Sequence, residues 1–254
     1  MKNEKDFARF KSLTFDDFKL MSKDDTLSKY QKIGFPDNYR EGKEKYIFRD
    51  IIQKLAMDNE KKGLTLLDIG PGCSDVPIMI LDFCKKNQYH VLLADSEEML
   101  EKLPDDANIS KYPGYFPDDS LMLVNQYQNK VDYIICYSVL HVAFYHTCIF
   151  KFIDTALSLL RTGGKFLIGD IPNITKRKRF FSTEQGIEFH QNFTRSKSLP
   201  EISYFTPEPT QIDDGVIFGI LQRYRSFGFE TYLLPQSDNL PMGNRREDIL
   251  ICKI

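Results

Sequence analysis

The sequence of 254 residues is long enough for one α/β domain with additions and for a sizeable apolar core. Its formal net charge of -2 gives no global positive field that would draw the protein to nucleic acid, so a site for an anionic partner must be local. The five cysteines are scattered without a CxxC pair, which argues against a disulfide framework and against a zinc or other metal site. The first residues lack an apolar signal segment, and no run is apolar for long enough to cross a bilayer. We therefore expect a cytoplasmic protein with buried thiols and no membrane partner.

Residues 1–60 are polar and helix-prone, which predicts a helical cap ahead of the main domain. Phe7, Phe10 and Phe18 would share one helical face of this cap. A second helical pattern runs from about residue 41 to residue 58, and it leads into the first predicted strand.

An apolar run followed by a glycine turn is the most informative stretch of the chain. Residues 64–69 have the composition of a central parallel strand that is buried on both faces. Gly70 and Gly72 then let the backbone turn sharply and pass close to a ligand, since neither residue has a Cβ atom. Ser74 or Asp75 would cap the helix that follows, over residues 76–87.

Two other interpretations of this turn stay open. A nicotinamide or flavin domain places a pyrophosphate at the helix N-terminus with the pattern G-x-G-x-x-G, whose last glycine is absent here. Asp68, just ahead of the turn, would also repel a pyrophosphate. The stretch is also compatible with an ordinary turn between a strand and a helix.

The run from Leu66 to Ser74 resembles the first motif of the class I S-adenosylmethionine-dependent methyltransferases, with Ser74 in place of the third glycine. The resemblance implies a doubly wound, mostly parallel sheet of seven strands in the order 3-2-1-4-5-7-6. It also implies S-adenosylmethionine as cofactor and S-adenosylhomocysteine as product. Cofactor contacts are then expected from Asp68, Gly70, Pro71 and Gly72. Arg40 is expected either to pair with the methionine carboxylate or to be a solvated arginine at a helix start.

The second predicted strand, residues 90–94, ends at an acidic residue. Asp95 lies about 20 positions after the glycine turn, where a carboxylate suits two hydrogen bonds to ribose hydroxyls. The alternative is that Asp95 only caps the next helix. The resemblance extends to Ser96 and to Met99, which would pack on adenine.

The third predicted strand, residues 110–116, is interrupted by Pro113 and Gly114 and therefore suits an edge or bulged strand. The resemblance implies that an acid after this strand contacts the adenine amino group. Asp118 and Asp119 are the candidates, and Asp119 is preferred.

The fourth predicted strand, residues 131–137, ends in Tyr137 and Ser138, in a run that resembles the fourth motif of the family and would lie beside the sulfonium. His141 is a candidate general base because its unperturbed pKa near 6.5 suits proton removal at neutral pH. It is equally a candidate for packing under the cofactor. A helix over about 150–160 is expected to end in a glycine cap at 161–164, before a fifth strand at 165–169.

The fifth strand delivers Asp170 to the carboxyl edge of the sheet, where it would contact the methyl acceptor or act as its base. Residues 173–214 show no periodicity, which predicts a lid without regular structure. The mixture of basic and aromatic residues in this lid suits an anionic acceptor or single-stranded RNA, and otherwise a solvated loop. The candidate acceptor-binding residues are Tyr39, Arg177, Arg179, His190 and Arg245.

A helix over 214–227 and strands over 229–234 and 249–254 would complete the sheet. The expected division is a cap (1–60), a cofactor-binding core (61–172), a lid (173–214) and a closing unit (215–254). We expect methyl transfer to an oxygen or nitrogen of a small anionic acceptor, such as a sugar nucleotide, a phosphorylated glycan precursor or a carboxylate metabolite. The alternatives are an RNA methyltransferase, an NAD(P)-binding oxidoreductase and a non-catalytic cofactor-binding protein.

Overall fold

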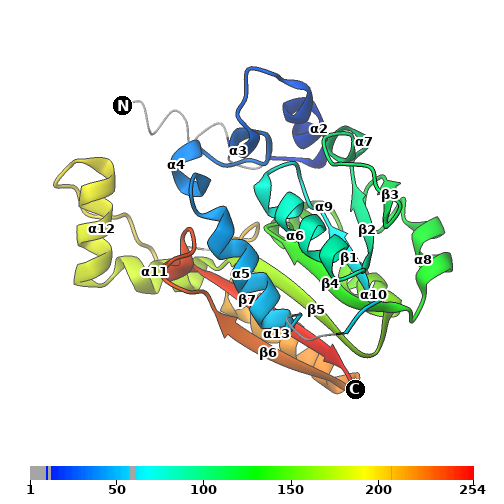
Figure 1. The fold of residues 1–254 in the computed structure, drawn as a ribbon. Helices are drawn as coiled ribbons and strands as arrows, with labels where there is room; N and C mark the ends of the chain where they lie inside the picture. Colours follow the sequence, from blue (N-terminus) through cyan, green and yellow to red (C-terminus); the bar gives the residue numbers. More distant parts are fainter. Residues whose placement is uncertain (1–9, 11–12, 58–60, 207) are drawn as a thin grey trace.

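The computed structural model describes residues 10, 13–57, 61–206 and 208–254, and its centre is a seven-stranded sheet in the order β3-β2-β1-β4-β5-β7-β6 (Figure 1). The strands are β1 (Thr65–Ile69), β2 (His90–Asp95), β3 (Ile109–Pro113), β4 (Val131–Tyr137), β5 (Leu160–Pro172), β6 (Phe229–Pro235) and β7 (Arg246–Lys253). Only β7 runs antiparallel to its neighbours β5 and β6. The fold class and strand order predicted from the sequence are therefore confirmed.

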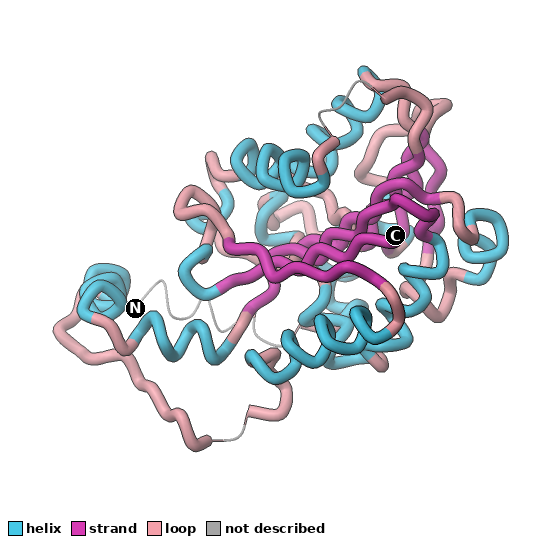
Figure 2. Tube along the Cα trace, turned by 90° about the horizontal axis from the view of Figure 1, so that it is seen from below, coloured by secondary structure: helices cyan, strands magenta, loops and turns pink. Residues whose placement is uncertain are grey.

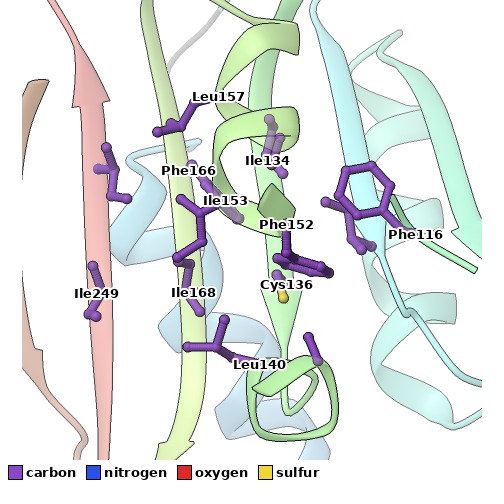
Figure 3. Packing of buried hydrophobic residues seen from close by; sticks show 14 of the residues in the cluster. Phe116, Ile134, Cys136, Leu140, Phe152, Ile153, Leu157, Phe166, Ile168 and Ile249 are labelled. Atoms are coloured by element: carbon purple, nitrogen blue, oxygen red, sulfur yellow. The ribbon is translucent and has the colours of Figure 1, made fainter. Parts of the chain in front are cut away.

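Helices cover both faces of this sheet (Figure 2). One face packs against α5 (Glu44–Leu55), α6 (Asp75–Lys86) and α7 (Glu97–Leu100). The other packs against α8 (Leu121–Tyr127), α9 (Leu140–His146), α10 (Ile149–Leu159) and α13 (Asp214–Ser226). Because successive strand residues point to opposite faces, Leu66 belongs to the first core and Leu67 to the second. Figure 3 shows Phe152 of α10 packed on Ile134 and Cys136 of β4 in the second core.

Three short helices form an N-terminal cap: α2 (Phe15–Lys23), α3 (Lys29–Lys32) and α4 (Asp37–Arg40). The first begins at Phe15 because the Thr14 hydroxyl accepts the Asp17 N–H in a capping box. Phe10 lies in a turn, so the prediction that it shares a helical face with Phe18 was wrong. Phe7, the third residue of that predicted face, lies outside the described residues. None of the helices in the described part of the chain has the length and apolarity needed to cross a bilayer.

The segment predicted to be a lid contains two helices, α11 (Ile174–Phe181) and α12 (Glu184–Thr194), so the prediction that it lacks regular structure was wrong. Both helices have side-chain caps. Asn173 accepts the N–H groups of Thr175 and Lys176, and Thr183 accepts the Gly186 N–H. The segment projects away from the sheet (Figure 1), so few of its apolar residues face the main core and no clear period results.

Two boundaries near the sheet also differ from the prediction. The glycine cap predicted at 161–164 is wrong, because α10 ends at Leu159 and Leu160 already pairs with Val131 of β4. The last strand begins at Arg246 rather than at Ile249, and its register places Arg246 opposite Pro172 of β5. This earlier start brings the residues just before Ile249 to the carboxyl end of β5.

Candidate functional site

A cavity lies at the carboxyl ends of β1, β2 and β4, where open α/β sheets bind their ligands. The strand ends and the turn between β1 and α6 form its floor. The N-terminal cap closes it from above with four apolar side chains: Phe15, Phe18, Ile33 and Phe35. The cavity is therefore built from two parts of the chain that are separate in sequence.

The turn between β1 and α6 requires glycine at two positions. Gly70 and Gly72 have φ values of 70° and 66°, in the left-handed region that side chains disfavour. A Cβ atom on Gly70 would lie 2.5 Å from Val139 Cγ2, and one on Gly72 would lie 2.8 Å from Ile33 Cγ2. The backbone of this turn is thus held between the end of β4 and the cap.

Asp95 at the end of β2 fixes this turn. Its carboxylate accepts the Gly72 N–H at 3.0 Å and the Ser96 N–H at 2.7 Å. Burial raises the pKa of Asp95 to about 6, and these two hydrogen bonds oppose that rise. The N-cap of α7 is Ser96, whose hydroxyl accepts the Met99 N–H, so the alternative that Asp95 only caps the helix was wrong. Met99 and Asp95 line the cavity.

Asp68 is the second buried acid in the cavity wall and is 4% exposed. Burial, and then the charge of Asp95, raises the pKa of Asp68 to about 8. Within the described part of the chain, no residue donates a hydrogen bond to this carboxyl group. A ligand with a positive charge or with hydroxyl donors would stabilise its ionised form.

A third carboxylate occupies the N-terminus of α6. Glu44 is 3% exposed, and its Oε2 accepts the Asp75 N–H at 2.9 Å. In dinucleotide-binding domains a pyrophosphate sits at this helix end. Here the phosphate groups would meet the carboxylates of Glu44 and Asp75, with Asp68 nearby in the cavity wall. The geometry disfavours a dinucleotide.

Arg40, Ser138 and Asp170 form a hydrogen-bonded chain beside the cavity. Arg40 Nη2 donates to Ser138 Oγ at 2.8 Å, and this hydroxyl donates to Asp170 Oδ2 at 2.5 Å. Arg40 is 3% exposed, so the alternative of a solvated arginine was wrong. Its Nε is buried and has no hydrogen-bond partner among the described residues. Ser138 and Asp170 have φ values of 62° and 56°, a strained conformation that is concentrated at functional sites.

His141 lies near this chain but does not line the cavity. Its Nδ1 is buried and has no partner within the described ranges. Burial and the charge of Arg246 lower the pKa of His141 to about 4, and Asp170 opposes this shift. The imidazole is neutral at pH 7 and is a weak base.

The two acids after β3 lie outside the cavity. Asp118 is exposed and pairs with Lys151, and Asp119 is exposed and accepts the Tyr115 N–H at 2.8 Å. The cavity wall at this place consists of Gly114, Tyr115 and Phe116 instead. Tyr137 and Pro71, also predicted to contact the cofactor, do line the cavity.

The helices α11 and α12 form an aromatic cluster in which neighbouring ring centroids lie 5.1–6.3 Å apart: Phe180, Phe181, Phe189 and Phe193. The guanidinium groups of Arg177 and Arg245 lie 5.1 and 5.8 Å from the Phe181 centroid. The His190 ring also contacts Phe181. These three predicted acceptor residues are thus brought together.

Tyr39 joins this cluster and Arg179 does not. The Tyr39 ring lies 6.2 Å from Phe193, and the charge and hydrogen bond of Arg245 act on its phenol. Arg179 points to the other side of α11, where it pairs with Asp214. The structure therefore separates Arg177 from Arg179, which the sequence grouped together.

No family model matches the sequence, and no curated protein sequence is significantly similar to it. The plantazolicin methyltransferase BpumL, solved with a monoazolic desmethylPZN analog and SAH, matches 94% of this chain and 98% of its own, with a TM-score of 0.56 at 11% identity. The chain has the class I S-adenosylmethionine-dependent methyltransferase fold.

Two carbon methyltransferases share this methyltransferase fold. CurJ matches 82% of this chain with a TM-score of 0.51 at 17% identity, and DszA matches 83% with a TM-score of 0.53 at 14% identity. The match covers 53% of each of those two chains, so this chain spans about half of their length.

Sequence reasoning missed Ile33, which the methyltransferase fold brings to the site. Ile33 covers Gly72, and nothing in the sequence of the cap distinguishes it from other apolar residues. Arg246 donates to the Asp170 carbonyl at 3.1 Å. The antiparallel register of β7 places this arginine beside the end of β5, opposite Pro172.

Proposed function

We propose that this protein transfers a methyl group from S-adenosylmethionine to a small acceptor. The cavity supports this proposal because Asp68 and Asp95 line it while Glu44 occupies the α6 N-terminus. Acids that are buried and incompletely hydrogen-bonded favour a ligand with positive charge and ribose hydroxyls over one with a pyrophosphate. When bound, the cofactor supplies a methyl group that is activated by a sulfonium.

The residues around the cavity have distinct proposed roles. Asp95 accepts the ribose hydroxyls, while Met99 packs against adenine, in a wall completed by Phe116. Asp68 faces the positively charged methionine end. Arg40 binds the methionine carboxylate, since its Nε is unpaired within the described residues.

The acceptor side begins at Ser138 and Asp170, beyond the methionine end of the cavity. We propose that Asp170 positions the acceptor atom and that His141, a weak base that does not line the cavity, packs beneath the site instead of acting as a general base. In this proposal residues 1–60 close over the cofactor, 61–172 bind it, 173–214 cover the acceptor and 215–254 complete the sheet. The basic residues beside the aromatic cluster suit an anionic metabolite, which would accept the methyl group on an oxygen or a nitrogen.

Calorimetry with S-adenosylhomocysteine, NAD and NADP tests the proposal. We expect binding of S-adenosylhomocysteine alone, and Asp95→Ala should weaken that binding by about 1–3 kcal/mol. Binding of NAD or NADP without S-adenosylhomocysteine would contradict it. Metabolite pools incubated with methyl-labelled cofactor and read by mass spectrometry should then identify the acceptor. A complete absence of label transfer, with S-adenosylhomocysteine bound, would instead support a non-catalytic cofactor-binding protein.

A further inference from the structure

Three arginines form a cluster where α11 meets the start of β7: Arg177, Arg245 and Arg246. Burial lowers the pKa of Arg245, and the positive charges of Arg246 and Arg177 lower it further. Arg177 and Arg245 also share the Phe181 ring, with guanidinium carbons 5.1 and 5.8 Å from its centroid. In Figure 1 the α11 helix and the first residues of β7 lie on the same side of the molecule, below α4.

The positive charges of this arginine cluster are not balanced by neighbouring carboxylates among the described residues. Among the residues that the structure describes, no carboxylate lies within ion-pair distance of Arg177 or Arg245, and Arg246 reaches only Asp170, at 3.8 Å. Other basic side chains of α11 are paired, Lys176 with Glu247 and Arg179 with Asp214. Arg177 is exposed, whereas Arg245 and Arg246 are half-buried. Because crowding three positive charges and partly desolvating two of them is unfavourable, the arginine cluster favours an anion at this place.

The arginine cluster is connected to the cofactor cavity at two points. On α4, Arg40 lines the cavity while its neighbour Tyr39 interacts with Arg245. From β5, Asp170 accepts the Ser138 hydroxyl on the cavity side and contacts Arg246 on the other. An anion held by the arginine cluster would therefore place the rest of its molecule beside the methionine end of the cavity.

We propose that Arg177, Arg245 and Arg246 bind a carboxylate or phosphate of the methyl acceptor, a small molecule whose apolar or aromatic body packs against the aromatic cluster. The assignment of the bound molecule as the methyl acceptor rests on the proposed methyltransferase function. The existence of the anion site does not. Guanidinium groups match the geometry of both oxyanions by paired N–H donors. Phe189 is 38% exposed and offers an apolar surface beside Arg245, whose guanidinium carbon is 5.5 Å from its centroid.

The test measures anion binding to the full chain saturated with S-adenosylhomocysteine, by calorimetry at low ionic strength. The probes are inorganic phosphate and benzoate, with benzyl alcohol as the uncharged analogue of benzoate. We expect both anions to bind and benzyl alcohol to bind at least tenfold more weakly than benzoate. Arg245→Gln and Arg177→Gln should each weaken the binding of both anions at least tenfold.

Arg179→Gln is the matched control, because Arg179 lies on the same helix but is paired with Asp214. It should leave the dissociation constants of phosphate and benzoate unchanged. Arg245→Lys keeps the charge but removes the paired donors, so its affinity for phosphate and benzoate should lie between those of wild type and Arg245→Gln. A folded Arg245→Gln protein should also have a Tm no lower than that of wild type without anion, because a half-buried positive charge beside two other arginines, without a carboxylate partner, has been removed.

Equal anion binding by wild type, Arg177→Gln and Arg245→Gln would overturn the proposal. So would an absence of phosphate and benzoate binding to wild type, or benzyl alcohol binding as tightly as benzoate. The same titrations repeated without S-adenosylhomocysteine separate the two proposals. Failure of wild type to bind S-adenosylhomocysteine contradicts the methyltransferase function, whereas arginine-dependent anion binding in that experiment still supports an anion site.

Discussion

Asp68 carries a proton in most free molecules at neutral pH, since burial raises its pKa to about 8. The nearby charge of Asp95 acts in the same direction, and no described residue donates a hydrogen bond that would favour the ionised form. A cation or hydroxyl donor in the cavity supplies the missing stabilisation. Ligand binding and proton release at Asp68 are therefore linked.

The affinity for S-adenosylhomocysteine should rise with pH between about 6 and 8, because binding requires Asp68 to lose its proton. The slope of log Kd against pH should approach about -1, the value for one proton released per ligand. Calorimetry in buffers of different ionisation enthalpy counts that proton. Asp68→Asn should remove the release and flatten the profile. A flat profile for the wild-type protein would show that Asp68 does not interact with the ligand.

The same two acids should make the free protein less stable as pH rises. The pKa of Asp68 (about 8) and that of Asp95 (about 6) both exceed the ordinary aspartate pKa, so protonation stabilises the folded state. This stability is fully present below pH ~4 and is lost as pH rises to about 8. Urea unfolding should show that the stability advantage of Asp68→Asn over wild type is greater at pH 9 than at pH 5 by roughly 4 kcal/mol. If this stability difference were the same at the two pH values, the raised pKa of Asp68 would be contradicted.

At the scale of the element, sequence predicts strands that are buried on both faces better than segments whose contacts are tertiary. The limits of β4 agree with the prediction, because the run from Val131 to Tyr137 is apolar or aromatic at every position except Asp132. The start of β5 was missed, since Leu160 joins the sheet only through its pairing with Val131. Helix α12 was missed because its phenylalanines pack on those of α11 rather than on the main core.

The site follows the same division. Asp68 and Asp95 were predictable because each lies at the end of a buried strand next to a turn. The separation of Arg177 from Arg179 was not, since it depends on which face of an unpredicted helix meets β7. The position of Arg246 beside Asp170 could be predicted only with the antiparallel register of β7 against β5.

The turn between β1 and α6 should not tolerate a side chain at Gly70. Gly70→Ala combines a left-handed φ of 70° with a Cβ contact of 2.5 Å to Val139. We expect a loss of about 1–3 kcal/mol in stability and weaker S-adenosylhomocysteine binding, measured by urea unfolding and calorimetry. Gly219→Ala in α13 is the control, since its Cβ meets no atom within 4 Å and helix propensity favours alanine. If the two variants behave alike, the turn is not constrained as described.

At the scale of the whole molecule, one short helix joins the two halves of the proposed active site. Arg40 and Tyr39 are consecutive residues of α4, and they face the cofactor cavity and the arginine cluster respectively. The N-terminal cap also contacts the core through the partly exposed ion pair between Lys23 and Glu98, at 2.9 Å. Exposed pairs of this kind contribute little, so the docking of the cap depends mainly on its apolar residues.

Because the N-terminal cap supplies a wall of the cavity, its docking should control the escape of the cofactor. Ile33 covers Gly72 from above, and Ile33→Ala should remove that contact while leaving the sheet core intact. We expect the dissociation rate of S-adenosylhomocysteine to rise about tenfold, equivalent to roughly 1.4 kcal/mol, in stopped-flow displacement experiments. Leu20→Ala is the matched control, because Leu20 lies in the same cap, is 69% exposed and does not line the cavity. Hydrogen exchange should slow across α2 to α4 when wild type binds S-adenosylhomocysteine, and this protection should be smaller in Ile33→Ala. An unchanged dissociation rate in Ile33→Ala would mean that the cofactor leaves by a route that the cap does not close.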